Sequence, residues 1–403
     1  MADDYVRLDT ELDTASPRAI TFNLITSGLG SAIFSLPWCV AGCSILPGLA
    51  IIFVVLFLNA WTISILVHAA DRYGEFDLGS LIGRLPCGLG KPLQALTNVF
   101  LWFSMFLCLV SYIIAIYDSA HKIQEIDRRW LVAYASLGVF PLCLLDQRRL
   151  EIFSVAAVVI NLYILVVIAE LLAQGTTTAG DDEMDHEDTC LVGWTERGMF
   201  ATSSIVFQAV IIQMVVLPMY KELRNRTPAL MDRIVAVAFL SLFFLFAGFS
   251  IVGYLYVGPK VKSNILVDLP SFPSTNLAQV STVVVCACVY PFMVIPMVAT
   301  FTHDPNGYAG IAVKLCIIAC AGAFAAIPDL HLDHVNTING AMSAALFVGV
   351  LPSAVGYFLL RGGPFQQVRL LFLVVVGLAL ALAGLLYRDN YLNELQCFRY
   401  VHS

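Results

Sequence analysis

The feature that most constrains this chain is the length of its segments without a charged residue. Ala19–Ala70 holds no Asp, Glu, Lys or Arg over 52 residues, and Leu269–His303 is likewise free of formal charge. A helix that crosses the hydrocarbon core of a bilayer needs about 20 apolar residues. Because lipid offers no hydrogen-bond partner to open backbone groups, such segments cross as helices. The sequence therefore predicts an all-α polytopic membrane protein.

The overall composition excludes most other classes of protein. Only 13% of the 403 residues are charged, whereas about 25% are charged in an ordinary soluble domain. A net charge of −7 disfavours a nucleic acid partner, because phosphate backbones are bound by basic patches. The predicted spans contain no paired catalytic side chains and no strong metal-ligand motif. We therefore expect neither an enzyme nor a metal site.

The apolar segments predict eleven membrane spans. They divide the chain into an N-terminal tail at residues 1–18, a transmembrane domain at 19–387 and a C-terminal tail at 388–403. The predicted spans lie at residues 19–42, 45–69, 93–117, 130–146, 151–173, 198–220, 233–257, 276–300, 311–328, 335–359 and 369–387.

The basic residues predict the orientation of these spans. If the N-terminal tail is cytosolic, 14 of the Lys and Arg residues lie on the cytosolic side and 8 on the outer side. This bias agrees with the positive-inside rule, so we expect a cytosolic N-terminus and a C-terminal tail on the opposite face. Cys190 and Cys397 lie outside the spans, which leaves a disulfide between them open.

Two of the predicted spans carry residues that interrupt a helix. One span contains Ser27-Gly28-Leu29-Gly30-Ser31 followed by Pro37. The sixth span contains Phe207-Gln208-Ala209 and Gln213, followed by Pro218. Interrupted helices at corresponding positions of two halves are the best sequence pointer to a binding site within the membrane. The alternative is that glycine only allows close helix packing and proline only bends the helix.

Five short motifs follow one another along residues 20 to about 300. They are Asn23-x3-Ser27-x2-Gly30-Ser31 with Leu36-Pro37, Tyr112–Asp118, Leu217–Leu223, Gly253–Gly258 with Val261–Leu266, and Pro291-x4-Pro296. In this order they resemble the amino acid/auxin permease family, which belongs to the amino acid–polyamine–organocation group. The resemblance implies a five-plus-five inverted repeat, with repeats at about residues 19–173 and 198–359 and an extra helix at about 369–387.

The resemblance also implies a function. Members of the family are secondary transporters that move amino acids by alternating access, driven by protons or sodium or running as facilitators. A membrane-bound amino acid sensor of the same fold is the alternative, and the short tails favour transport. The expected partners are an amino acid substrate and membrane lipid, and we expect a monomer. We expect the protein to lie in the plasma membrane or in a vacuolar or lysosomal membrane.

The two breaks predict where an amino acid would bind. We expect free N–H groups near Gly28–Ser31 to bind the substrate carboxylate, and carbonyl groups near Phe207–Val210 to bind its ammonium. Gly30 is expected to need a positive φ or to allow a close approach of the substrate. Aromatic side chains at Phe103 and Phe106 are further candidates for selecting the substrate side chain. The predicted substrate-binding residues are Thr26, Gly28, Leu29, Gly30, Ser31, Phe207, Gln208, Val210 and Gln213.

The only cofactor expected is a coupling ion, either a proton or sodium. In sodium-coupled relatives an amide in the first span and a hydroxyl in the eighth span supply oxygen ligands, and our alignment places Thr26 and Val289 there. Because Val289 has no side-chain oxygen, we favour proton coupling or facilitation over sodium. A proton would need a titratable group near the site. The candidates are His68, Asp118, Glu170, Glu222 and Lys314.

Overall fold

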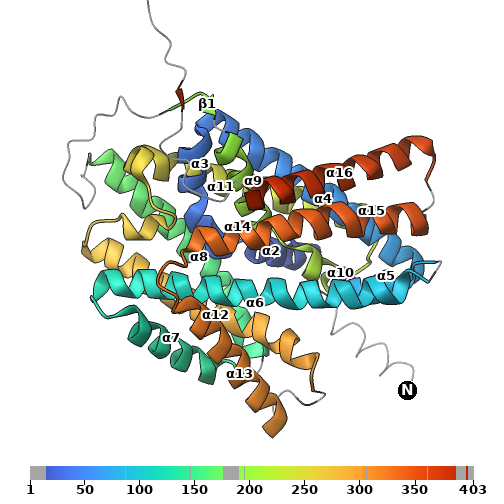
Figure 1. The fold of residues 1–403 in the computed structure, drawn as a ribbon, viewed down its shortest axis with the longest axis horizontal. Coiled ribbons are helices and arrows are strands. Elements are labelled where there is room, and N and C mark those ends of the chain that lie inside the picture. Colours follow the sequence, from blue (N-terminus) through green and yellow to red (C-terminus); the bar gives the residue numbers. More distant parts are fainter. Residues whose placement is uncertain are drawn as a thin grey trace, which may run out of the picture.

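The computed structural model is almost entirely helical (Figure 1). It describes residues 15–86, 88–144, 147–175, 190–194, 196–302, 304, 307–360, 362–386 and 396–397. The longer helices are α2 (Pro17–Ser27), α3 (Leu36–Cys43), α4 (Ile45–Tyr73), α6 (Gly90–Ile123), α7 (Arg128–Leu142), α8 (Gln147–Ala173), α9 (Glu196–Ala209), α10 (Gln213–Glu222), α11 (Pro228–Val257), α12 (Pro273–Ala299), α13 (Tyr308–Ala325), α14 (Leu332–Ser343) and α16 (Pro364–Leu386). The short elements are η1 (Ser31–Ser35), α5 (Leu78–Gly83), β1 (Gly193–Trp194), η3 (Gly258–Lys260), η4 (Ile265–Val267), η5 (Ala344–Val350), α15 (Leu351–Val355), η6 (Gly356–Leu360) and β2 (Gln396–Cys397).

Ten of the predicted spans correspond to segments that can cross a membrane. Within the described residues, nine are long and apolar enough by themselves, and the bent pair of α2 with η1 and α3 is the tenth. Large apolar side chains such as Phe53, Phe244 and Leu371 are more than half exposed on the outside of this bundle. Such exposure is expected where a protein faces lipid rather than water.

The eleventh predicted span, residues 130–146, coincides with α7, which has only 15 residues and a length of about 22 Å. If each of the other candidate spans crosses the membrane, backbone pairing requires α7 to cross as well. Ala15 N donates to Glu222 O at 2.8 Å and Arg224 N donates to Ala15 O at 3.0 Å, so these residues lie on one face. An even number of crossings must separate them. The α2–α3 pair, α4, α6, α8 and α9–α10 provide five, so α7 provides the sixth.

The two short strands show on which face of the membrane the C-terminal end of the described chain lies. β1 and β2 are antiparallel, and Gly193 pairs with Cys397 while Trp194 pairs with Gln396. β1 precedes the crossing made by α9 and α10, whereas the residues that pair with Ala15 follow it. Ala15 and β2 therefore lie on opposite faces of the membrane, as eleven crossings require. Cys190, just before β1, is disulfide-bonded.

The core consists of two buried hydrophobic clusters. The larger one draws on α2, α3, α4, α9, α11 and α15, and the smaller one on α6, α7, α12 and α13. In Figure 1, α6 runs across the molecule with α7, α12 and α13 on one side and α14 and α16 on the other. The breaks after α2 and α9 belong to the larger cluster through Leu29 and Val210. The candidate site lies where these breaks meet Tyr112 and Cys286 of the smaller cluster.

Candidate substrate site

The break in the first span interrupts the helix for three residues. Gly28 N–H still donates to Leu24 O at 3.2 Å, and Leu29 N–H donates to Thr26 O at 3.0 Å. Gly30 is then fully extended, with φ −87° and ψ −174°, and its N–H has no hydrogen-bond partner among the described residues. The helical segments on the two sides are bent by 51° relative to each other. The expected free donor is therefore Gly30, whereas the Gly28 and Leu29 N–H groups are bound within the chain.

The break in the sixth span consists of three consecutive β-branched residues, Val210, Ile211 and Ile212, which have weak helix propensity. Val210 N–H donates to Phe207 O at 3.3 Å and Ile212 N–H donates to Val210 O at 2.8 Å. The predicted carbonyls of Phe207 and Val210 are thus partly engaged by the chain itself. Ile211 N–H has no hydrogen-bond partner in the described part of the chain.

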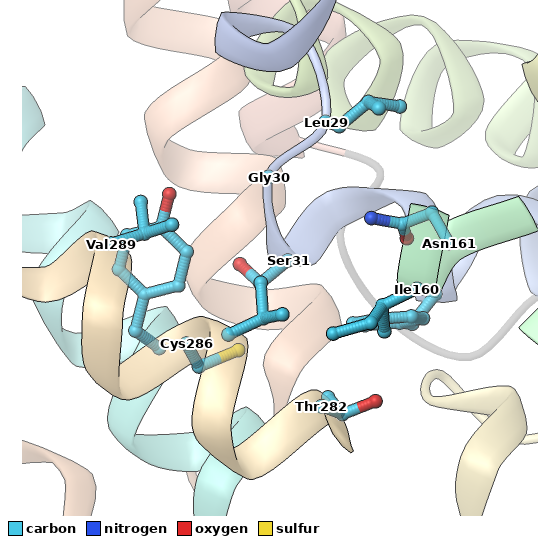
Figure 2. Close-up of a pocket in the computed structure, with 11 residues that line it drawn as sticks. Leu29, Gly30, Ser31, Ile160, Asn161, Thr282, Cys286 and Val289 are labelled. Carbon is cyan, nitrogen blue, oxygen red and sulfur yellow. The ribbon is translucent and has the colours of Figure 1, made fainter. Parts of the chain in front are cut away.

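Two small cavities lie against these breaks, and both are lined by Gly30, Ser31 and Tyr112. Figure 2 shows the first, in which the turn with Gly30 and Ser31 passes between α8 and α12. Its other lining residues are Leu29, Phe34, Ile160, Asn161, Thr282, Val285, Cys286 and Val289. The second cavity faces the break between α9 and α10, and its other lining residues are Ser27, Ala32, Cys108, Gln208, Ala209, Ile211, Met214 and Met293.

Both cavities are too small for an amino acid in this conformation. Their volumes are about 10 Å³ and 30 Å³. A single water needs about 10–15 Å³ on this measure, so each holds one or two waters at most. A substrate would therefore enter only after the helices around the breaks move apart.

The cavity walls carry polar groups but no charged side chain. Gln208 Nε2 donates to Cys108 Sγ at 3.4 Å, while Gln208 Oε1 is buried without a partner. Asn161 Oδ1 is buried without a partner as well. Buried polar atoms are costly when unpaired, so unpaired groups at a cavity wall are available to a ligand. The N–H groups of Gly30 and Ile211 add donors, so the walls can hydrogen-bond both ends of a zwitterion.

Four of the nine predicted site residues line the cavities: Leu29, Gly30, Ser31 and Gln208. The other five do not, namely Thr26, Gly28, Phe207, Val210 and Gln213. Gln213 has a different contact, because its Nε2 donates to Asn59 Oδ1 at 2.6 Å and to Thr62 Oγ1 at 3.3 Å. It thereby connects α10 to α4.

Four further side-chain expectations change in the same way. Thr26 Oγ1 donates to Phe22 O at 3.0 Å within its own helix. Phe207 is 1% exposed within the larger hydrophobic cluster. Phe103 is 42% exposed on the outside, and Phe106 stacks on Trp102 with ring centroids 5.9 Å apart. These residues pack the helices and do not line either described cavity.

The expectation that Gly30 needs a positive φ is wrong, because its φ of −87° is open to any residue. A Cβ there would meet only Tyr112 Oη, at 3.6 Å, which is an ordinary contact. The crowded glycine is Gly28, where a Cβ would lie 2.7 Å from Leu242 Cδ1. Gly28 thus serves close packing of α2 on α11, while a side chain at Gly30 would extend toward the cavities.

Tyr112 is the main site residue that the sequence did not identify. It lines both cavities, and its hydroxyl has no hydrogen-bond partner in the described chain. Its presence in the Tyr112–Asp118 motif was the only signal available. The sequence did not identify Asn161 or Thr282 as site residues either, because a single polar residue in an apolar span does not reveal which face of the helix it occupies.

None of the five titratable candidates for proton coupling lines either cavity. His68, Glu170 and Glu222 are exposed, and Lys314 is buried on α13. Asp118 is partly buried, and its Oδ2 accepts a hydrogen bond from Asn264 Nδ2 at 3.0 Å. Val289 does line the first cavity.

A helical bundle with ten candidate spans in its described part, two of them broken around a small polar site, is the architecture of a secondary transporter. Residues 13–387 match the family described as transmembrane amino acid transporter protein. The chain therefore belongs to the transmembrane amino acid transporter family, and it is a multi-pass membrane protein.

Two relatives carry transporter names. The amino acid transporter AVT6E of Arabidopsis thaliana is 24% identical over 267 residues, which are 61% of this chain and 53% of that protein. The chain thus spans about half the length of this plant relative. The putative sodium-coupled neutral amino acid transporter 11 of Bos taurus is 22% identical over 359 residues, or 85% of this chain and 76% of that protein.

The fold is shared with solved structures of the transporter Mhp1. Its inward-facing conformation superposes with a TM-score of 0.57 at 13% identity, covering 96% of this chain and 93% of that one. Its closed conformation with bromovinylhydantoin bound gives a TM-score of 0.53 at 12% identity, covering 96% and 95%. These identities are low, so the likeness concerns the fold alone.

Proposed function

We propose that this chain is a secondary transporter of neutral amino acids and that the substrate binds between the two broken helices. One observation carries the proposal: the walls of the two cavities offer unpaired hydrogen-bond donors and acceptors but no charged side chain. A zwitterion can pair both of its charged ends with such groups. A second charge on the substrate side chain would be left unpaired, which is costly at membrane depth.

Uptake into proteoliposomes tests this proposal. The purified chain should take up neutral amino acids and discriminate against lysine, arginine, aspartate and glutamate. Equal uptake of a cationic or anionic amino acid would contradict the neutral class. Binding of an amino acid without any uptake under any imposed gradient would favour the sensor instead.

We also propose that transport is coupled to protons, or is facilitative, rather than coupled to sodium. Val289 gives the first cavity no oxygen at the expected ligand position. Of the titratable candidates, Asp118 lies on the helix that carries Tyr112, six residues further along and about 9 Å away. The basic side chains near Asp118 are Arg128, His121 and His331. A carboxyl group in this position could bind and release a proton as the outer end of the site opens.

Substitution of Asp118 separates the coupling modes. In a proton-coupled carrier, Asp118→Asn should abolish the acceleration of uptake by an inward proton gradient while leaving substrate exchange intact. Glu222→Gln, at an exposed position, is the matched control and should keep the response. Uptake that collapses when sodium is replaced by choline at fixed pH and voltage would refute the proposal.

A further inference from the structure

A cavity of about 440 Å³ lies between α4 and the beginning of α16, away from the substrate site. Trp61 and Ile65 line it from α4. From the other side it is lined by Gly363, Phe365, Gln366, Arg369 and Leu370. Its volume is many times that of either cavity at the breaks, so it can hold a polar group with several heavy atoms in the present conformation.

The cation in this cavity is Arg369, which is held by aromatic rings. Its guanidinium carbon lies 4.9 Å from the ring centroid of Phe365 and 5.7 Å from that of Trp61. In the described part of the chain, no Asp or Glu oxygen lies within 4.0 Å of it. Stacking on a ring fixes the plane of a guanidinium and leaves its N–H edge free, which suits bidentate binding of a phosphate.

The depth of Arg369 places it at the polar boundary of the bilayer. It lies five residues after the start of α16, about 8 Å along a helix of 23 residues. The helix is about 34 Å long, somewhat longer than a hydrocarbon core of about 30 Å. A charged side chain near the helix end therefore reaches the level of the lipid phosphates. The distribution of Lys and Arg predicts that this end faces the cytosol, where membrane leaflets carry anionic lipids.

The surface beside the cavity is apolar and outward-facing. Phe365 is 73% exposed, Val368 65% and Leu371 64%, and all three lie on the first turns of α16. A soluble anion has no apolar part that could contact this face. The acyl chains of a lipid could lie along it while the headgroup occupies the cavity.

We propose that this cavity binds the phosphate of an anionic phospholipid. Arg369 binds the phosphate oxygens, the Gln366 amide lines the same cavity and can hydrogen-bond the headgroup, and Trp61 closes the site from α4. A bound lipid would join α4 to α16, two helices that lie far apart in sequence. The alternative is an interfacial arginine that merely packs on aromatic rings, without a lipid partner.

Lipid binding to the purified full-length chain tests the proposal. In neutral detergent, added phosphatidylglycerol should raise the midpoint of thermal unfolding and give a one-to-one adduct in native mass spectrometry, while phosphatidylcholine should give neither. Arg369→Gln should weaken phosphatidylglycerol binding about tenfold or more, because it removes a charge-assisted hydrogen bond. Trp61→Leu should weaken binding less, because the charge remains.

The matched control is Arg233→Gln, which removes an exposed charge on the same side of the membrane outside the cavity. This variant should bind phosphatidylglycerol as the unmodified chain does. Equal loss in both arginine variants, or no loss in Arg369→Gln, would overturn the proposal and leave only general attraction to anionic surfaces. Displacement of the lipid by millimolar glycerol 3-phosphate or inorganic phosphate would instead identify a site for soluble phosphates and would also refute it.

Discussion

At the scale of single residues, an unmade hydrogen bond points to substrate recognition only where the unpaired atom belongs to a residue that lines a cavity. Gln208 and Gln279 are both buried glutamines whose Oε1 has no partner. They differ in position, because Gln208 lines the second cavity whereas Gln279 donates through Nε2 to Leu266 O at 3.0 Å and lines neither cavity. This pair allows a specific test of the site.

Gln208→Met should raise the apparent KM for a neutral amino acid about tenfold, which corresponds to one hydrogen bond of ~1–1.5 kcal/mol. The folded yield should change little, because the substitution removes an acceptor that is already unpaired and a single weak N–H···S hydrogen bond to Cys108. Gln279→Met is the control and should leave KM unchanged, although it leaves Leu266 O without its donor. KM measured by uptake and yield measured by size-exclusion chromatography give both readouts. An unchanged KM in Gln208→Met would remove this residue from the site.

The two glycines of the first break should respond to alanine in opposite ways. Gly28→Ala would put a Cβ 2.7 Å from Leu242 Cδ1, so we expect a loss of about 1–3 kcal/mol in stability with normal affinity in the surviving protein. Gly30→Ala fits the backbone but extends toward Tyr112 Oη, so we expect normal stability and weaker substrate binding. Thermal unfolding and binding per folded molecule separate the two effects. The reverse pattern would place the substrate next to Gly28.

At the scale of helices, buried polar pairs fix how helices sit against their neighbours. Gln213 connects α10 to α4 through Asn59 and Thr62. Asn339 of α14 connects to α6, since Ser104 Oγ donates to Asn339 Oδ1 at 2.7 Å and Asn339 Nδ2 donates to Ser104 O at 3.1 Å. Such pairs hold a helix in one rotation, because slipping would bury unpaired polar atoms.

Gln213→Leu should therefore act on stability and not on affinity. It leaves Asn59 Oδ1 buried without this donor, which costs about 1–3 kcal/mol. We expect a lower unfolding midpoint and an unchanged KM. Thr62→Val removes the longer contact, at 3.3 Å, and the hydrogen bond that Thr62 Oγ1 donates to Asn59 O at 2.9 Å. It leaves the Gln213–Asn59 hydrogen bond in place and should cost less. If Gln213→Leu instead raised KM at full stability, Gln213 would belong to the substrate site as the sequence predicts.

At the scale of the whole molecule, backbone pairs near the two ends of the described chain place those ends on opposite faces, so the number of crossings between them is odd. Ala15 pairs beside Leu223 and β2 pairs with β1, on opposite ends of the span formed by α9 and α10. Tags added before Met1 and after Ser403 should accordingly be accessible from opposite sides of a sealed membrane, with the N-terminal tag cytosolic. Access to both tags from one side would require ten crossings and would make α7 a peripheral helix.

The sequence by itself determined the spans and the two breaks, because hydropathy and helix interruption are properties of neighbouring residues. It also predicted that Gly30, Ser31 and Gln208 lie near a site, from the glycines of the first span and from the glutamines and Pro218 of the sixth. Only the tertiary structure decided which polar groups converge there. Tyr112, Asn161 and Thr282 come from three different helices, and each reaches the cavities through the rotation of its helix. That rotation is fixed by packing between residues far apart in sequence, which is also why Gln213 faces Asn59 instead of the substrate.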